Sequence, residues 1–174
     1  MPPGTPAKAV TVRRARTSDV PAVRRLLDAY VRDRILLDKA TVTLYESLQE
    51  FWVAERDDDA KVVGCGALHV MWEDLAEVRT LAVDGEFRGA GVGHQVLDKL
   101  LQTARWLGVR RVFCLTFEVD FFAKHGFTEI GETPVDSDVY AELLRSYDEG
   151  VAEFLGLERV KPNTLGNSRM LLHL

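Results

Sequence analysis

Hydrophobic residues along the chain alternate as in strands over some stretches and repeat at helical spacing over others. In the first half the pattern predicts strands at 9–13, 51–54, 61–72 and 75–83, and helices at 20–30 and 42–48. In the second half it predicts helices at 94–107, 120–124 and from 136 or 137 through 147, and strands at 109–116, through 130 and at 170–174. Residues 151–157 either extend the last helix or form a further turn, and the polar run at 161–169 predicts an irregular segment.

Local residue choices support these boundaries. Thr17, Ser18 and Asp19 offer an N-cap for the first helix, and Gly108 suits the end of the helix at 94–107. Gly64 and Gly66 lie inside a predicted strand, which indicates a bulge or a close backbone approach.

A glycine-rich stretch connects the strand at 75–83 to the helix at 94–107. With the first residue of that helix it comprises Arg88, Gly89, Ala90, Gly91, Val92, Gly93 and His94. Glycines let the backbone come close to a ligand, and the N–H groups and dipole of a helix start favour a phosphate. The stretch therefore predicts a site for the pyrophosphate of a large cofactor, with Arg88 adding positive charge.

Composition narrows the class of protein. The 174 residues, of which 47% are hydrophobic and 28% charged, predict one soluble globular domain over 9–174 behind a disordered, proline-rich tail at 1–8. The formal net charge of −5 argues against a nucleic-acid partner. No apolar run is long enough to span a membrane, so we expect no membrane partner. Cys65 and Cys114 lack metal-ligand spacing, and as two buried free thiols they indicate a cytoplasmic protein without a metal.

Three motifs, in this order, resemble the GNAT superfamily of N-acetyltransferases. They are the strand 78–83 with its Leu-x-Val end, the Arg-x-x-Gly-x-Gly loop at 88–93, and Phe121-Phe122-Ala123-Lys124-His125-Gly126-Phe127. The last is similar to the family's Phe-Tyr-x-x-x-Gly-Phe turn, and the resemblance covers about residues 10–130. It implies an α/β (α+β) GNAT fold, in which a central mixed, mostly antiparallel sheet of about seven strands is flanked by helices.

Residues 35–37, 64–68, 77–83 and 121–127 further resemble the acetyltransferase domain of N-acetylglutamate synthases. The resemblance implies acetyl transfer from acetyl-CoA to the α-amine of L-glutamate or L-glutamine, the first step of arginine biosynthesis. Larger members carry an amino-acid-kinase domain that binds feedback arginine, so we expect a short, stand-alone form in which that regulation is in doubt. A GNAT enzyme for another amine (a polyamine, an antibiotic or a protein N-terminus) and a non-catalytic acetyl-CoA sensor are the alternatives. A homodimer stays open.

The resemblance also assigns the parts of the acetyl-CoA site. Backbone groups of the strand end would pair with the pantetheine arm, residues 88–94 would hold the pyrophosphate, and the end of the next strand would flank the thioester. Besides the loop residues named above, the implied contacts are Leu81, Ala82, Val83, Thr116, Phe121 and Phe122.

The substrate ammonium group must lose a proton before it attacks, and a carboxylate near the thioester can accept that proton. Glu77 is the first candidate and Glu118 the second. A plain ion pair between Glu77 and Arg79 is an equally weighted interpretation of the same residues.

The leaving thiolate raises a separate question. Phe122 stands where many family members have a tyrosine that protonates this group, so residue 122 cannot be the acid. A thiol pKa of about 8.5 makes the thiolate a fair leaving group that water could protonate. Tyr140 and Tyr147 are the other candidates.

An amino-acid substrate carries a carboxylate that favours an arginine or a lysine-plus-amide clamp. Arg79 is well placed on its strand, and Leu36 would wall the side-chain pocket. The end of the chain supplies a polar cluster of Lys161, Asn163, Asn167, Ser168 and Arg169, which could instead be an exposed turn. His69 stands where the synthases often have a lysine, which makes glutamine as plausible a substrate as glutamate.

Overall fold

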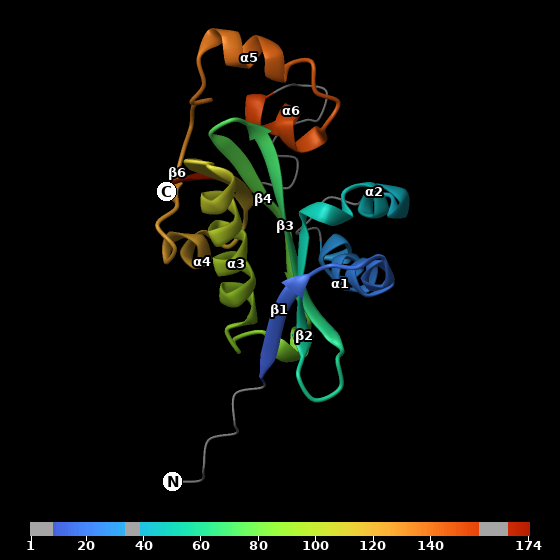
Figure 1. Cartoon of the computed structure of the whole chain (residues 1–174). Helices are drawn as coiled ribbons and strands as arrows, with labels where there is room; N and C mark the ends of the chain where they lie inside the picture. Colours follow the sequence, from blue (N-terminus) through green and yellow to red (C-terminus); the bar gives the residue numbers. More distant parts are fainter. Residues whose placement is uncertain (1–8, 34–38, 157–166) are drawn as a thin grey trace. The chain divides into compact units, whose positions relative to one another are not determined.

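The computed structural model describes residues 9–33, 39–156 and 167–174, and Figure 1 shows the course of the chain. The tail expected at 1–8 lies outside the described residues, as do Leu36, Lys161 and Asn163. The α-helices are α1 Val20–Arg32, α2 Thr41–Glu46, α3 Val92–Leu107, α4 Val119–Ala123, α5 Ser137–Leu143 and α6 Glu149–Leu155. The strands are β1 Val10–Arg14, β2 Phe51–Arg56, β3 Val62–Trp72, β4 Leu75–Val83, β5 Arg111–Thr116, β6 Thr128–Glu129 and β7 Ser168–His173. Short 3₁₀ turns are η1 Thr17–Asp19, η2 Leu48–Glu50 and η3 Gly85–Phe87.

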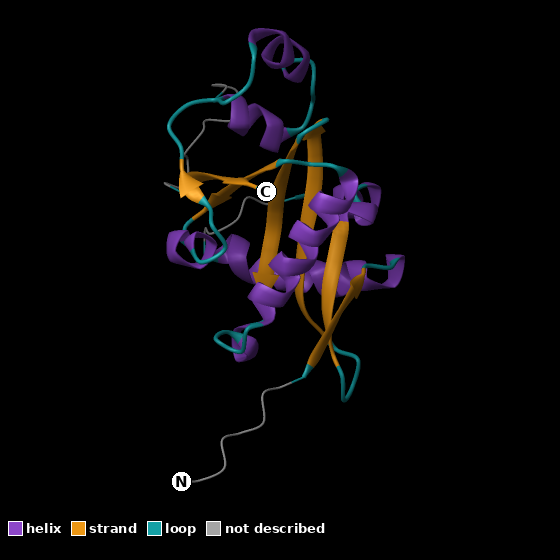
Figure 2. Cartoon of the chain, turned by 60° about the vertical axis from the view of Figure 1, so that its left-hand side comes forward, coloured by secondary structure: helices purple, strands orange, loops and turns teal. Residues whose placement is uncertain are grey.

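Within the described residues, seven strands form one sheet in the order β1-β2-β3-β4-β5-β7-β6, and they are orange in Figure 2. The pairs β1–β2, β2–β3, β5–β7 and β6–β7 are antiparallel, whereas β4 and β5 are parallel. Parallel neighbours need a crossover connection, which contains α3. The predicted mixed, mostly antiparallel sheet is therefore confirmed.

The described chain divides into two compact units. One comprises residues 1–67 and 80–102, and the other residues 68–79 and 103–174. The strands β3 and β4 and the helix α3 each contribute residues to both units. The single domain expected over 9–174 stays a prediction.

In the first unit the core forms between α1 and the sheet. Val20, Val23, Leu26 and Leu27 recur at helical spacing on α1 and are buried in one cluster with apolar residues of β2 and β3. Burial of this stripe is the main reason why the segment is helical. Asp19 precedes α1 but makes no side-chain cap bond to it, because its carboxylate accepts from the Arg16 N–H (2.6 Å) and from Arg13.

In the second unit the core forms between α6 and the strands β5 and β7. Val151, Phe154 and Leu155 of α6 are buried with Phe113 of β5 and Leu171 of β7. The rings of Phe113 and Phe154 meet edge to face with their centroids 5.1 Å apart. This packing fixes which face of α6 points inward.

Two glycines of β3 allow α3 to pack closely within the first unit. A Cβ at Gly64 would lie 2.9 Å from Val92 Cγ1, and one at Gly66 would lie 2.9 Å from Val96 Cγ1. Both valine side chains are buried, so neither has room to move away from an added Cβ. The close approach indicated by the sequence is thus a contact between strand backbone and helix side chains.

The prediction of one helix running through Tyr147 is wrong. α5 ends at Leu143 and α6 is a separate helix, whose first turn is capped by Asp148 accepting from the Val151 N–H (3.0 Å). Tyr147 lies between the two helices and is 97% exposed. A local cap and the burial of the face of α6 outweigh the weak helical spacing of residues 144–147.

Two further elements begin two residues earlier than the sequence predicts. α3 begins at Val92 and not at His94. β7 begins at Ser168, because Ser168 and Arg169 pair with Thr116 and Leu115 of β5. The prediction of an irregular segment at 161–169 is therefore wrong for Ser168 and Arg169. Their polar side chains did not indicate a strand.

The two cysteines are buried free thiols, as expected. Burial raises the pKa of Cys65 to about 12. Burial also raises the pKa of Cys114 well above its ordinary value, and the charge of Glu77 adds to this shift.

We expect Gly66→Ala to lower the free energy of unfolding by about 1–3 kcal/mol, because the added methyl would press on the side chains of Val96, Leu100 and Leu81. Urea unfolding monitored by circular dichroism measures the change. Gly85→Ala is the matched control, since nothing lies within 4 Å of a Cβ there. Equal stability of the two variants would contradict the close packing of α3 on β3.

Candidate active site

The glycine-rich loop of the first unit has the conformation that the sequence predicts for an anion site. Gly89 and Gly91 have φ angles of +78° and +81°, a region that favours glycine. No atom lies within 4 Å of a Cβ built at either position, so the backbone faces open space. Before the loop, Phe87 of η3 is buried and anchors the turn, and after it α3 begins. This arrangement fits a phosphate that takes N–H groups at the helix start.

Tyr30 of α1 is a functional candidate that the sequence did not reveal. Its hydroxyl donates to the Val83 carbonyl (3.1 Å) and accepts from the Val83 N–H (3.0 Å). The Arg88 guanidinium lies 5.2 Å from the centroid of the same ring. Tyr30 thus links the end of β4 to the glycine loop and occupies the Val83 backbone groups predicted to pair with pantetheine. Tyr30 is the last residue of the helix predicted at 20–30, and this position alone does not indicate such a role.

Thr80, in the same unit, holds a strained backbone conformation. Its φ angle is +56°, which is rare for a β-branched residue. Its Oγ1 is buried and has no hydrogen-bond partner, while its carbonyl accepts from the Cys65 thiol (3.5 Å). The strain lies immediately before Leu81, where the predicted cofactor contacts begin.

In the second unit, Arg79 is held between two carboxylates. Its Nε donates to Glu77 Oε1 (2.6 Å), and its two Nη atoms donate to the two oxygens of Asp148 (2.9 and 2.8 Å). His69 Nε2 lies 3.8 Å from Asp148 Oδ2. The ion pair between Glu77 and Arg79 is therefore present, as the alternative interpretation of these residues expected.

The start of α6 covers this ion pair. A Cβ on Gly150 would lie 2.5 Å from the Arg79 guanidinium and 2.7 and 2.9 Å from the two Glu77 oxygens. Only glycine leaves room for the pair at this position. Glu77 is consequently only 5% exposed.

Burial opposes the ionisation of Asp148, but the hydrogen bonds and charge of Arg79 outweigh it and hold the pKa of Asp148 well below its usual range. Asp148 also caps α6. One carboxylate thus fixes the helix and satisfies the arginine, and neither role was visible in the sequence.

Glu153 is a further buried ionisable residue of this unit, and Arg169 is half-buried. Glu153 is 5% exposed, and its Oε2 has no hydrogen-bond partner. The Arg169 Nε is likewise buried without a partner, although another nitrogen of the guanidinium donates to the Phe154 carbonyl. Arg169 lies opposite Leu115 in the β5–β7 ladder, at the strand end predicted to flank the thioester. The Asn167 Oδ1, two residues earlier, is also buried and unpartnered.

The turn that carries Phe121 and Phe122 is built from aromatic packing. Phe122 is buried and meets Phe121 and Phe127 edge to face, with centroids 5.1 and 5.2 Å away. Thr116 Oγ1 accepts from the Glu118 N–H (2.8 Å) just before α4. Glu118 is exposed, so the two carboxylates predicted as bases occupy very different surroundings.

A family match and a similar protein of known class identify the family of the chain. The family described as "Acetyltransferase (GNAT) domain" matches residues 47–129. An amino-acid acetyltransferase of Mycobacterium tuberculosis is 65% identical over 162 residues, which cover 92% of each chain. The chain belongs to the GNAT acetyltransferase family.

Solved structures agree with this assignment. A Mycobacterium tuberculosis protein in complex with CoA and NLQ has a TM-score of 0.90 and 64% identity, covering 94% of this chain and 99% of that one. N-acetylglutamate synthase from Neisseria gonorrhoeae, complexed with coenzyme A and N-acetyl-glutamate, has a TM-score of 0.75 and 23% identity. The match covers 95% of this chain and 35% of the synthase, and it shows the fold alone. The predicted GNAT family and the predicted acetyltransferase class are therefore confirmed.

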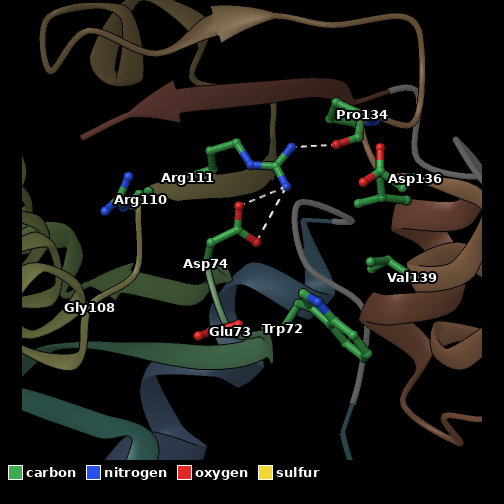
Figure 3. Close-up of a pocket in the computed structure, with 10 residues that line it drawn as sticks. Trp72, Glu73, Asp74, Gly108, Arg110, Arg111, Pro134, Asp136 and Val139 are labelled. Atoms are coloured by element: carbon green, nitrogen blue, oxygen red, sulfur yellow. Dashed lines mark hydrogen bonds and ion pairs between the residues drawn. The ribbon is translucent and has the colours of Figure 1, made fainter.

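In this acetyltransferase, a pocket of about 570 Å³ lies in the second unit and contains none of the predicted site residues. It is lined by the turn between β3 and β4, the start of β5 and the segment before α5 (Figure 3). The Arg111 guanidinium points between Asp74 (3.2 Å) and the Pro134 carbonyl, so its charge is already neutralised.

Metal ligation and membrane insertion find no support in the described part of the chain. No group of three or more His, Cys, Asp or Glu side chains in 9–33, 39–156 and 167–174 is arranged to hold a metal ion. No helix in that part of the chain has the length and apolar character needed to cross a membrane.

We expect Asp148→Asn to lower the free energy of unfolding by about 1–3 kcal/mol at pH 7, because asparagine keeps the cap but loses the charge paired with Arg79. The native pKa of Asp148 is depressed, so its contribution is complete above the unfolded value and is lost as pH falls. The gap between wild type and variant should therefore shrink between about pH 5 and pH 2. Urea unfolding at several pH values measures it. Asp138→Asn, at an exposed position of α5, is the control, and a pH-independent gap would contradict the assignment.

Proposed function

We propose that the protein transfers the acetyl group of acetyl-CoA to the α-amine of L-glutamate or L-glutamine. The observation that carries this proposal is the 65% identity to the Mycobacterium tuberculosis amino-acid acetyltransferase, which extends over 92% of both chains. The reaction would be the entry to arginine biosynthesis. Two buried free thiols fit a reducing compartment such as the cytoplasm.

The donor site is proposed at the end of β4 and in the glycine loop. Acetyl-CoA supplies an activated thioester, and the loop fits its pyrophosphate because Gly89 and Gly91 leave open space beside an exposed Arg88. Backbone groups of residues 81–83 would pair with the pantetheine arm after Tyr30 releases Val83. Thr116, Phe121 and Phe122 would line the arm, as the sequence predicts.

The acceptor site is proposed around the buried charges of the second unit. Arg79 and Arg169 are the cations for the substrate carboxylates, with Asn167 and Ser168 beside Arg169. Leu36, Lys161 and Asn163 stay sequence predictions. Because Arg79 is already paired with Asp148, a substrate carboxylate at this position must displace an internal one.

Glu77 and Glu118 stay the carboxylates that the sequence predicts as proton acceptors. Their surroundings differ, since Glu77 is bound to Arg79 and Glu118 is exposed. With phenylalanine at position 122, the leaving thiolate would take its proton from water or from the protonated nitrogen of the tetrahedral intermediate.

Release of free CoA thiol from acetyl-CoA across a panel of amines tests the proposal. We expect turnover with glutamate or glutamine and with no polyamine or peptide. Turnover only with polyamines or peptides would make the chain a GNAT enzyme for another amine. Binding of acetyl-CoA without turnover on any amine would make it a sensor.

We expect Gly91→Asp to weaken acetyl-CoA binding at least 100-fold, because the side chain strains a φ of +81° and its charge repels the phosphates. Isothermal titration calorimetry measures the affinity. Gly131→Asp adds the same charge at an exposed position with no atom within 4 Å of its Cβ, and it should bind normally. Normal affinity of Gly91→Asp would remove the loop from the donor site.

A further inference from the structure

Glu153 is a buried carboxylate without a complete set of partners. It lies on α6 between Ala152 and Phe154, both fully buried, and is itself 5% exposed. Its Oε2 has no hydrogen-bond partner among the described residues. A charged oxygen left in this state costs free energy, so a native protein keeps it only where a proton or a ligand completes it.

Arg169 offers the opposite charge in the same unit. Its Nε is buried and unpartnered, and its guanidinium is held in place over the Phe113 ring, 5.8 Å from the centroid, and by the Phe154 carbonyl. The charges of Glu153 and Arg169 act on each other, because each shifts the other toward its ionised form. An open acceptor and an open donor of opposite charge match the ammonium and carboxylate groups of a free amino acid.

The surroundings of Glu153 favour a proton near neutral pH. Burial is the largest contribution that raises the pKa of Glu153. The negative charges of Glu77 on β4 and Glu149 on α6 raise this pKa further, while the positive charge of Arg169 on β7 lowers it. Together these groups raise the pKa of Glu153 to about 7. A carboxyl of this kind can take up and release a proton at the pH where the enzyme works.

We infer that Glu153 binds the α-ammonium group of the amino-acid substrate and accepts its proton, with Arg169 holding the neighbouring carboxylate. The inference rests on the proposed function. The ammonium transfers one proton to the Glu153 carboxylate, and the neutral amine then attacks the thioester carbonyl carbon. A C–N bond forms, the C–S bond breaks, and the thiolate leaves with the electron pair. The second amine proton goes to the thiolate, and Glu153 returns its proton to water.

This assignment explains why Glu77 is buried in an ion pair. The carboxylate of Glu77 is bound to Arg79 Nε at 2.6 Å and covered by the Gly150 backbone, so its position is fixed. A fixed negative charge beside Glu153 increases the proton affinity of Glu153. Glu77 is thus a positioning residue that acts through Glu153.

The test compares Glu153→Gln with wild type from pH 6 to pH 9.5, using CoA release with the amino acid that wild type acetylates. We expect kcat of the variant to fall at least 100-fold at pH 7 and the acidic limb near pH 7 to disappear. Above about pH 9 the substrate amine is neutral without help, so the variant should regain most of its activity. Its thermal stability at pH 8 should rise, because glutamine removes a buried charge.

Glu149→Gln is the matched control, since it removes an exposed carboxylate from the same helix. It should keep kcat and move the acidic limb slightly toward lower pH. Glu77→Gln should move that limb further in the same direction without removing it.

The outcomes separate the two proposals. Absence of turnover in wild type with every amino acid overturns the proposed function itself. If wild type is active, a Glu153→Gln variant with normal kcat and an unchanged pH profile overturns the role of Glu153. Loss of the acidic limb in Glu77→Gln, with Glu153→Gln unaffected, would assign the proton to Glu77.

Discussion

The guanidinium of Arg79 imposes the constraint on which the second unit is built. A buried cation must be fully paired, and Glu77 and Asp148 together take three of its nitrogen atoms. Asp148 is also the cap of α6, so pairing the charge places the helix. Residue 150 is glycine because no side chain fits beside the pair, and α6 also carries the buried carboxylate of Glu153.

The first unit follows a different principle, in which backbone conformation and not charge creates the site. Gly89 and Gly91 adopt positive φ angles without crowding, whereas Thr80 adopts one at a cost. Tyr30 satisfies the backbone of Val83 where β4 ends. In the proposed function, main-chain geometry would thus prepare donor recognition, and side-chain charge would prepare acceptor recognition.

This difference explains what the sequence could predict. The glycine loop, the α1 stripe and the Gly-Phe turn are local patterns, and each predicted its element correctly. The loop and the turn also predicted the family. The sequence could not predict that Asp148 and Glu153 of the α6 region lie near Arg79 and Glu77. These residues are far apart along the chain, and only packing brings them together. Ser168 and Arg169 belong to β7, but the sequence predicts a turn there because polar residues are weak indicators of a strand.

The position of Cys114 has a consequence for redox chemistry. Its thiol is buried, and the charge of Glu77 further disfavours its thiolate. Thiol–disulfide exchange needs a thiolate that can reach its partner, and Cys65 is equally shielded. A protein that would release a thiol at every turnover therefore keeps its own two cysteine thiols out of mixed disulfides with that product.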